Sequence, residues 1–259
     1  MQTKQQLADK IAAKLNLESN RDAYQPEIDD LYFLYQTIRE KSITSILEFG
    51  SGWSTYVLAI ALKENYDAFG ISHSASIRHP NSFQLLTIDA SKSWQSVALA
   101  RLDETLKAFV TAIASSPELI EINGVICHRY LNVPNFIPDF IYLDGPDHNQ
   151  VTGEINGFSY NDNFTTPMSA DILAIEPFLW PETLIVTDGR TANARFLSSR
   201  LKRNWQYLHD PFGDRAIFRL EETAFGTISE DHILLRKAIS RKLSNKEEPE
   251  GIPESEILK

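Results

Sequence analysis

Four of the short apolar runs in this sequence end on, or next to, an acidic residue. These residues are Glu48, Asp89, Asp144 and Asp188. Carboxylates can take up a proton, accept hydrogen bonds from hydroxyl groups, or bind a hard cation such as Mg²⁺. A single residue of this kind could equally cap the helix that follows it. Four of them in equivalent places favour a shared binding site instead.

A glycine-containing segment begins at the first of these acidic residues. It reads Glu48-Phe49-Gly50-Ser51-Gly52-Trp53-Ser54-Thr55. Glycines let the backbone turn sharply and let a ligand approach closely. Thr55 stands where a dinucleotide-binding G-x-G-x-x-G sequence has its third glycine, and no lysine follows as in a Walker-type phosphate loop. The segment therefore departs from both of these phosphate-binding patterns.

The same segment resembles E/D-x-G-x-G-x-G, the first motif of class I S-adenosylmethionine (SAM)-dependent methyltransferases, with Ser54 in place of the third glycine. The resemblance extends over about residues 43–220. SAM carries no phosphate, which agrees with a loop that lacks a lysine. The resemblance implies that Asp89 holds the ribose hydroxyls of SAM. It also implies cofactor contacts from a set of residues in the glycine segment, namely Glu48, Gly50, Ser51, Gly52, Trp53 and Ser54.

Two further segments follow predicted strands at the places where this family has its acceptor-side residues. They are Asp144-Gly145-Pro146-Asp147-His148 and Asp188-Gly189-Arg190. The predicted catalytic residues are Asp144, His148 and Asp188, with His148 as general base because an imidazole can take up a proton near neutral pH.

The pair Asp144 and Asp188 is also similar to the carboxylates that hold a divalent cation in metal-dependent O-methyltransferases. This similarity implies a Mg²⁺ site, because Mg²⁺ prefers oxygen ligands and lowers the pKa of a bound hydroxyl. Gly189, however, stands where those enzymes commonly have an Asp or Asn.

Short apolar runs alternate with helical stretches from residue 43 onward. The runs cover residues 43–49, 82–89, 123–130, 139–144 and 182–188. Strands separated by helices favour parallel pairing, because a parallel return needs a crossover. Residues 205–220 contain two β-like segments around a Pro-Phe-Gly-Asp turn and predict an antiparallel hairpin. The predicted fold is therefore α/β, a doubly wound and mostly parallel seven-stranded sheet that ends in an antiparallel hairpin and is preceded by N-terminal helices.

The helical segments divide the chain into three predicted parts. Residues 1–42 form a helical extension, residues 43–243 form the Rossmann-like domain, and residues 244–259 form a mobile acidic tail. The Ala- and Leu-rich stretch 93–116 has helical periodicity and is expected to form a crossover helix.

The composition narrows the classes of partner. The chain has 259 residues, a net charge of −10 and one cysteine. An acidic chain is poorly suited to nucleic acid or anionic membranes, which require clustered Lys and Arg. No apolar run is long enough for a membrane span, and the N-terminus lacks a signal-peptide core. These features predict a cytoplasmic protein that acts on a small molecule, with no nucleic-acid or membrane partner.

The predicted function is methyl transfer from SAM to a hydroxyl group, or with less support an amine, of a small-molecule acceptor. Another Rossmann-like enzyme remains open at this stage, either a nicotinamide oxidoreductase or a Mg²⁺-dependent hydrolase. A non-catalytic nucleotide-binding module of the same fold is the third alternative. A fold can host each of these activities. The sequence identifies neither the acceptor nor the oligomeric state.

Overall fold

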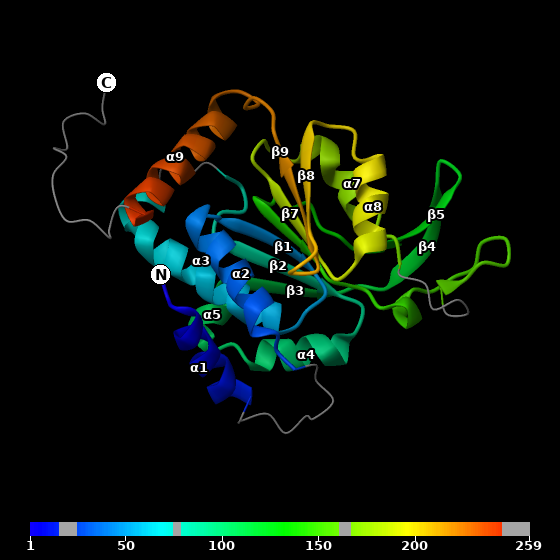
Figure 1. The fold of residues 1–259 in the computed structure, drawn as a ribbon, viewed down its shortest axis with the longest axis horizontal. Helices are drawn as coiled ribbons and strands as arrows, with labels where there is room; N and C mark the ends of the chain where they lie inside the picture. Colours follow the sequence, from blue (N-terminus) through cyan, green and yellow to red (C-terminus); the bar gives the residue numbers. More distant parts are fainter. Residues whose placement is uncertain (16–24, 75–78, 161–166, 245–259) are drawn as a thin grey trace.

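A seven-stranded sheet forms the centre of the computed structural model, which describes residues 1–15, 25–74, 79–160 and 167–244 (Figure 1). Its strand order is β3-β2-β1-β6-β7-β9-β8. The strands are β1 (Ser45–Phe49), β2 (Gln84–Asp89), β3 (Val110–Ala114), β6 (Phe140–Leu143), β7 (Leu184–Asp188), β8 (Trp205–Asp210) and β9 (Arg215–Leu220). The tail predicted from residue 244 onward lies, except for its first residue, outside the described ranges.

The pairing of the strands confirms the predicted fold class. Strands β3, β2, β1, β6 and β7 pair in parallel, whereas β9 is antiparallel to both β7 and β8. The hairpin predicted at 205–220 consists of β8 and β9. The seventh strand of the sheet along the chain is thus the reversed one, as the resemblance to class I methyltransferases implies.

The position of the third strand differs from the prediction. Residues 123–130 were expected in the parallel sheet, but β5 (Val125–Tyr130) pairs antiparallel with β4 (Pro117–Ile122) in a separate two-stranded sheet. The third parallel strand is instead β3, inside the stretch expected to be one helix. That stretch contains α4 (Lys92–Ala100), α5 (Glu104–Lys107) and then β3. Its Ala-rich sequence has the composition of a helix, and β3 forms an edge strand that is only partly buried.

Helices cover both faces of the sheet. Figure 1 shows α2 (Ile28–Glu40), α3 (Trp53–Ser74) and α9 (Thr227–Ser244) over one face, and α7 (Asp171–Ile175) and α8 (Thr191–Arg200) beside the other. The N-terminal helix α1 (Lys4–Leu15) packs on α2. None of the helices in the described ranges combines the length and apolar character that crossing a membrane requires.

Strand residues alternate between two hydrophobic cores, one on each face. Ile46 and Tyr142 pack in the core beneath α2 and α3, whereas their neighbours Leu47 and Leu143 pack in the core that includes α8. This alternation is the period-2 geometry of a strand. Burial on both faces explains why the central strands read as continuous apolar runs.

A buried carboxylate holds the edge of the sheet at which the parallel strands begin. Asp139 accepts hydrogen bonds from the backbone N–H groups of Thr44 and Ser45 and from the side chains of His232 and Arg236 of α9. Surrounding positive charge keeps the pKa of Asp139 well below its usual range despite its burial. This network connects β1, β6 and α9 at the edge where the parallel strands begin. The opposite edge, where these strands end, is the one at which ligands bind in such sheets.

Candidate functional site

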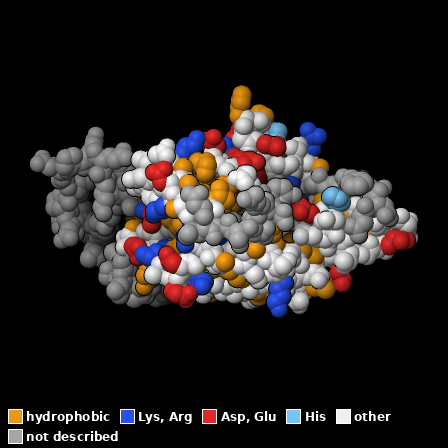
Figure 2. Space-filling model, turned by 90° about the horizontal axis from the view of Figure 1, so that it is seen from below, with side chains coloured by type: hydrophobic (Ala, Val, Ile, Leu, Met, Phe, Trp, Pro, Cys, Tyr) orange, Lys and Arg blue, Asp and Glu red, His pale blue; other side chains and the backbone are white. Residues whose placement is uncertain are grey.

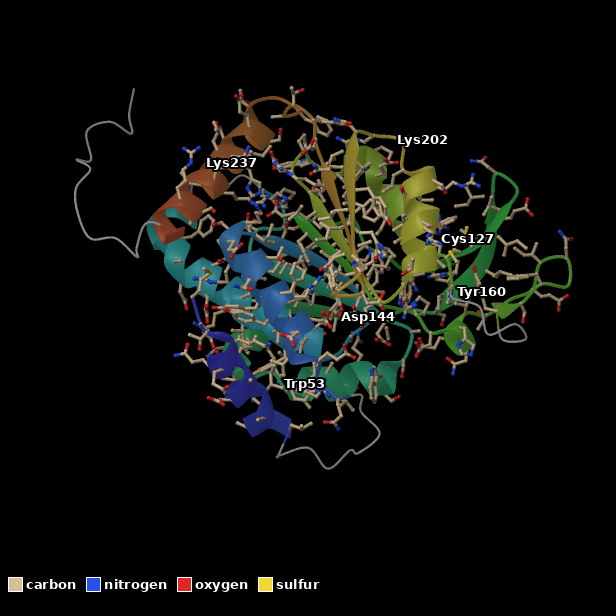
Figure 3. The ribbon with its side chains drawn as sticks, in the orientation of Figure 1. Trp53, Cys127, Asp144, Tyr160, Lys202 and Lys237 are labelled. Carbon is tan, nitrogen blue, oxygen red and sulfur yellow. The ribbon has the colours of Figure 1, made fainter. Side chains whose placement is uncertain are left out.

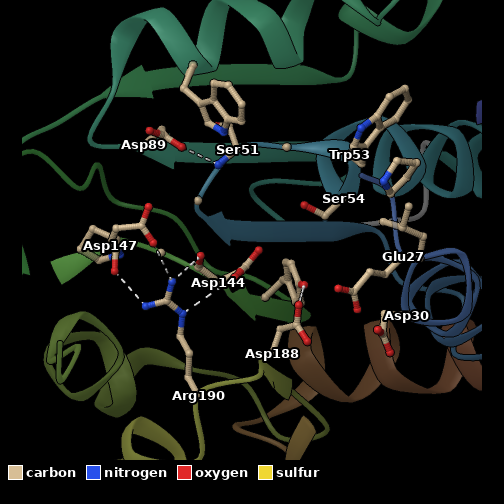
Figure 4. Close-up of a pocket in the computed structure, with 18 of the residues that line it drawn as sticks. Glu27, Asp30, Ser51, Trp53, Ser54, Asp89, Asp144, Asp147, Asp188 and Arg190 are labelled. Atoms are coloured by element: carbon tan, nitrogen blue, oxygen red, sulfur yellow. Dashed lines mark hydrogen bonds and ion pairs between the residues drawn. The ribbon is translucent and has the colours of Figure 1, made fainter. Parts of the chain in front are cut away.

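A cavity of about 340 Å³ opens at the carboxyl ends of β1, β2, β6 and β7 (Figure 4). Ligands bind at this edge in open parallel sheets, and the volume falls within the range of small-molecule sites. Figure 3 shows Asp144 and Trp53 at this end of the molecule, with Lys237 of α9 at the opposite end. The cavity is lined by most of the residues that the sequence singled out, namely Gly50, Ser51, Gly52, Trp53, Ser54, Asp89, Asp144 and Asp188.

Two glycines allow the loops after β1 and β6 to meet. Gly50 has φ +95°, and a Cβ placed on it would lie 2.9 Å from the carbonyl oxygen of Asp144. A Cβ placed on Gly145 would lie 2.9 Å from the Cα of Gly50. Both positions therefore require glycine. This backbone contact fixes Asp144 next to the glycine turn.

Glu48 stabilises the glycine turn between β1 and α3 by hydrogen bonds and does not line the cavity. Its side chain is fully buried and accepts hydrogen bonds from the hydroxyls of Ser54 (2.6 Å) and Thr55 (2.7 Å). Thr55 also accepts a hydrogen bond from the backbone N–H of Gly52 at 3.0 Å. Burial raises the pKa of Glu48 to about 7. The hydroxyls of Ser54 and Thr55, at the two positions where glycine patterns differ from this sequence, therefore position the turn.

Asp89 lies at the other side of the turn. One oxygen of its carboxylate accepts a hydrogen bond from the backbone N–H of Ser51 at 2.7 Å, and the other accepts one from Ser91 at 2.6 Å. The residue is 5% exposed, so it is reached only through the cavity. Burial raises its pKa. Each oxygen keeps a lone pair for a ligand hydroxyl.

Asp144 and Asp188 both reach the cavity from neighbouring strands. Burial in the recess raises the pKa of Asp144 to about 7, with Arg190 opposing the shift and the charges of Asp188 and Glu48 adding to it. Its side chain is nevertheless 45% exposed, and the residue lines the cavity. Asp188 accepts a hydrogen bond from the hydroxyl of Tyr142 at 2.9 Å, and burial raises its pKa as well.

Arg190 joins the loops that follow β6 and β7. Its guanidinium donates hydrogen bonds to the carbonyl oxygens of Pro146 (2.8 Å) and Asp144 (3.0 Å). It also lies 3.8 Å from the carboxylates of Asp144 and Asp147, as the dashed lines in Figure 4 show. The arginine therefore occupies the flank of Asp144 and fixes the shape of this wall.

His148 is not brought to the cavity with the other predicted residues. It is the first residue of a short 3-10 helix, η1 (His148–Gln150). Asp147, which precedes this helix, and Gln150, which ends it, line the cavity, whereas His148 does not.

The structure also adds residues that the motifs did not indicate. They lie at the start of α2, directly after α4, and on β5 and β6, and they are Glu27, Asp30, Arg101, Tyr130 and Tyr142.

The Mg²⁺ site at Asp144 and Asp188 stays a prediction. Gly189 supplies no side-chain ligand, the Tyr142 hydroxyl is hydrogen-bonded to Asp188, and the positive charge of Arg190 lies beside Asp144. Mg²⁺ requires near-octahedral oxygen ligands.

A second group of potential metal ligands lies at the opposite sheet edge. Within the described ranges, His79, Asp139 and His232 bring three such atoms to within 4.8 Å of one another. Asp139 is there already hydrogen-bonded to the Arg236 guanidinium at 2.9 Å. The positive charge of Arg236 therefore already balances the negative charge of Asp139 in this cluster.

Two buried polar groups in the cavity wall have no hydrogen-bond partner among the residues that the structure describes. They are the indole N–H of Trp53, which is 6% exposed, and the hydroxyl of Tyr130, which is 1% exposed. An unpaired buried polar group costs about 1–3 kcal/mol. A ligand with hydrogen-bonding groups would satisfy both. Beside Trp53, the guanidinium of Arg101 stacks on the indole ring at 3.9 Å.

The chain matches no family model and no curated protein. Among solved structures it is similar to the O-methyltransferase from Bacillus cereus in complex with SAH, at 13% identity and a TM-score of 0.46, covering 86% of this chain and 93% of that one. It is also similar to the SAH-bound Podospora anserina methyltransferase PaMTH1, at 13% identity and a TM-score of 0.48, covering 83% and 88%.

A third similar structure is the O-methyltransferase TomG from Streptomyces achromogenes in complex with SAM, at 14% identity and a TM-score of 0.42, covering 83% of this chain and 89% of that one.

Proposed function

We propose that this chain transfers a methyl group from SAM to a hydroxyl group of a small molecule. The observation that carries the proposal is the cavity between the glycine turn after β1, Asp89 at the end of β2 and Asp144 after β6. It offers a carboxylate for a ribose, a close-approach turn, and a carboxylate suited to proton transfer on the opposite wall.

Asp89 would hold the ribose hydroxyls, because its oxygens keep acceptor capacity beyond the bonds to Ser51 and Ser91. Gly50 and Gly52 would let the cofactor approach the backbone. The indole N–H of Trp53 and the hydroxyl of Tyr130 would donate to the polar atoms of the ligand, which removes the cost of leaving them unpaired.

Asp144 would act at the acceptor. A pKa raised to about 7 suits a group that takes a proton near neutral pH. SAM supplies an electrophilic methyl group on a sulfonium. The acceptor oxygen forms a bond to the methyl carbon while the carbon–sulfur bond breaks with its electron pair left on sulfur, and the hydroxyl proton passes to Asp144. Arg190 and the Tyr142–Asp188 hydrogen bond would hold this wall in place.

The charge of the cavity favours SAM over a dinucleotide. Among its lining residues are six carboxylates and two guanidiniums. A pyrophosphate would be repelled by this surplus, whereas the sulfonium and ammonium of SAM would be attracted.

The test is a thermal-shift comparison of S-adenosylhomocysteine (SAH) with NAD on the full chain. A ligand that binds only the native state raises the apparent stability. SAH should raise the melting temperature in a concentration-dependent way, and NAD should not. Stabilisation by NAD without stabilisation by SAH would overturn the proposal in favour of a nicotinamide enzyme.

A further inference from the structure

Four carboxylates gather at the end of the cavity away from Asp89. They are Glu27 and Asp30 at the start of α2, Asp144 after β6, and Asp188 at the end of β7, and we call them the acidic end. Figure 4 shows Glu27, Asp30 and Asp188 on the side of the cavity opposite Asp89, with Asp144 between. Three separate elements thus bring negative charge to one place.

These carboxylates interact with one another. The pKa of Glu27 is raised first by a hydrogen bond with Asp30, then by burial and by the charges of Asp30 and Asp188. The pKa of Asp188 is raised by burial and by the charge of Asp30. Like charges held close in a recess disfavour full ionisation unless a cation compensates them.

Among the described residues, the cations near the acidic end compensate only part of its charge. Arg190 is held against the loop after β6, and Arg101 stacks on the ring of Trp53. Arg215 forms an ion pair with Asp30 at 3.1 Å, although it also pairs with Asp210 at 2.9 Å. Bound SAM would add one net positive charge, because its sulfonium and ammonium outweigh its carboxylate by one. Six lining carboxylates therefore still exceed the positive charges near them.

The wall of the same cavity also carries two unpaired polar groups, which the proposed function assigns to the cofactor. The indole N–H of Trp53 and the hydroxyl of Tyr130 are both more than nine-tenths buried, line the cavity and have no partner. Buried polar groups are almost always hydrogen-bonded in native proteins. The acidic end is thus part of a cavity built to hold a polar molecule.

We propose that the methyl acceptor is a cationic small molecule whose ammonium group lies among Glu27, Asp30 and Asp188 while its hydroxyl faces Asp144. This inference rests on the proposed function and names the acceptor class for the same site. An ammonium group there gains attraction from Asp30 and Asp188, which are partly buried, and from the exposed Glu27, whereas a carboxylate or phosphate on the acceptor would be repelled. The methyl-transfer step is unchanged, and the ammonium takes no part in bond breaking.

The test uses three phenols of similar size that differ in charge: tyramine with an ammonium group, tyrosol with a neutral hydroxyl, and 4-hydroxyphenylacetate with a carboxylate. Each is titrated by calorimetry into the full chain saturated with SAH. Tyramine should bind about tenfold or more tighter than tyrosol, which corresponds to one favourable charge contact, and 4-hydroxyphenylacetate should bind weakest. The preference should shrink as salt is raised, because salt screens the attraction.

Two matched variants locate the effect. Glu27→Gln removes one charge from the acidic end, at a position whose side chain makes no helix-capping hydrogen bond. It should weaken tyramine binding severalfold and leave tyrosol binding unchanged. Glu121→Gln makes the same change at an exposed site on β4 and should alter neither.

The possible outcomes separate this inference from the proposed function. If SAH binds but tyramine shows no advantage over tyrosol, or no phenol binds the SAH complex, the cationic acceptor is wrong and methyl transfer stands. If SAH itself does not bind, the proposed function fails first. A tyramine preference that persists in Glu27→Gln would place the cation elsewhere and overturn the assignment.

Discussion

The carboxylates in the cavity lining and directly behind it play different structural roles. Glu48 is fully buried and bonded to two hydroxyls, Asp89 accepts two backbone N–H bonds, and Asp144 faces the cavity beside Arg190. In the sequence these residues look alike, because each ends an apolar run. Their different roles come from their neighbours in space.

The sequence predicted which strand ends meet but not everything that surrounds them. Asp89, Asp144 and Asp188 were found because parallel strands bring their carboxyl ends to one edge. Glu27 and Asp30 lie outside the motifs from which the site was predicted. Their approach to Asp188 depends on how α2 packs on the sheet, and no short motif encodes that packing.

A substitution at Asp89 tests whether this single carboxylate binds the cofactor. Asp89→Asn should weaken SAH binding about tenfold, because it removes a charge-assisted hydrogen-bond acceptor worth about 1.5–3 kcal/mol. Calorimetric titration of SAH measures the effect. The amide also disturbs the bond to Ser51 or Ser91, so the unfolding free energy is measured alongside.

Asp103→Asn is the matched control for this variant. Asp103 also accepts backbone N–H bonds at a helix start, from Thr105 and Leu106, but it lies outside the cavity lining. It should lower stability and leave SAH affinity intact. Unchanged SAH affinity in Asp89→Asn would mean that the ribose does not lie at this carboxylate.

Among the elements, the turn from β1 to α3 is the most constrained. Glu48 on β1 bonds to Ser54 and Thr55 in the first turn of α3, and Gly50 packs on the backbone of the loop after β6. The sequence predicted this turn because glycines stand directly after a strand. It misplaced β3 because an Ala-rich edge strand and an amphipathic helix have similar composition, and only pairing with β2 distinguishes them.

The contact between β1 and α3 predicts a pH dependence of stability that arises from Glu48. Its pKa is raised from 4.5 to about 7 because it is desolvated between β1 and α3. A carboxyl group with a higher pKa in the folded state binds its proton more tightly there. Its stabilising contribution is therefore full below the unfolded pKa and is lost as the pH rises toward about 7.

Glu48→Gln stays neutral and should escape this loss. Urea unfolding at a series of pH values should show the stability of the variant gaining on that of the parent, by on the order of 1 kcal/mol per pH unit between about pH 5 and pH 7. Glu121→Gln on β4 should show no such gain. Parallel stability curves for Glu48→Gln and the parent would contradict a buried, protonated Glu48.

Over the whole molecule, the fold concentrates negative charge at one edge of the sheet. The chain carries a net charge of −10, and the face in Figure 2 shows acidic and basic side chains interspersed. The charge of the cavity lining is predominantly negative, with six carboxylates and two guanidiniums. The two sheet edges also differ, since Asp139 and Arg236 pair at one edge whereas carboxylates without enough cations remain at the other. The local surplus, more than the overall charge, favours a cationic cofactor and acceptor.

The central claim is that this cavity holds SAM with its reactive methyl group directed at Asp144. The most direct measurement is a crystal structure of the chain with bound SAH. The account predicts that the ribose hydroxyls lie within hydrogen-bond distance of the Asp89 carboxylate and that the sulfur faces Asp144. SAH bound outside this cavity, or bound within it with its sulfur turned away from Asp144, would contradict the account.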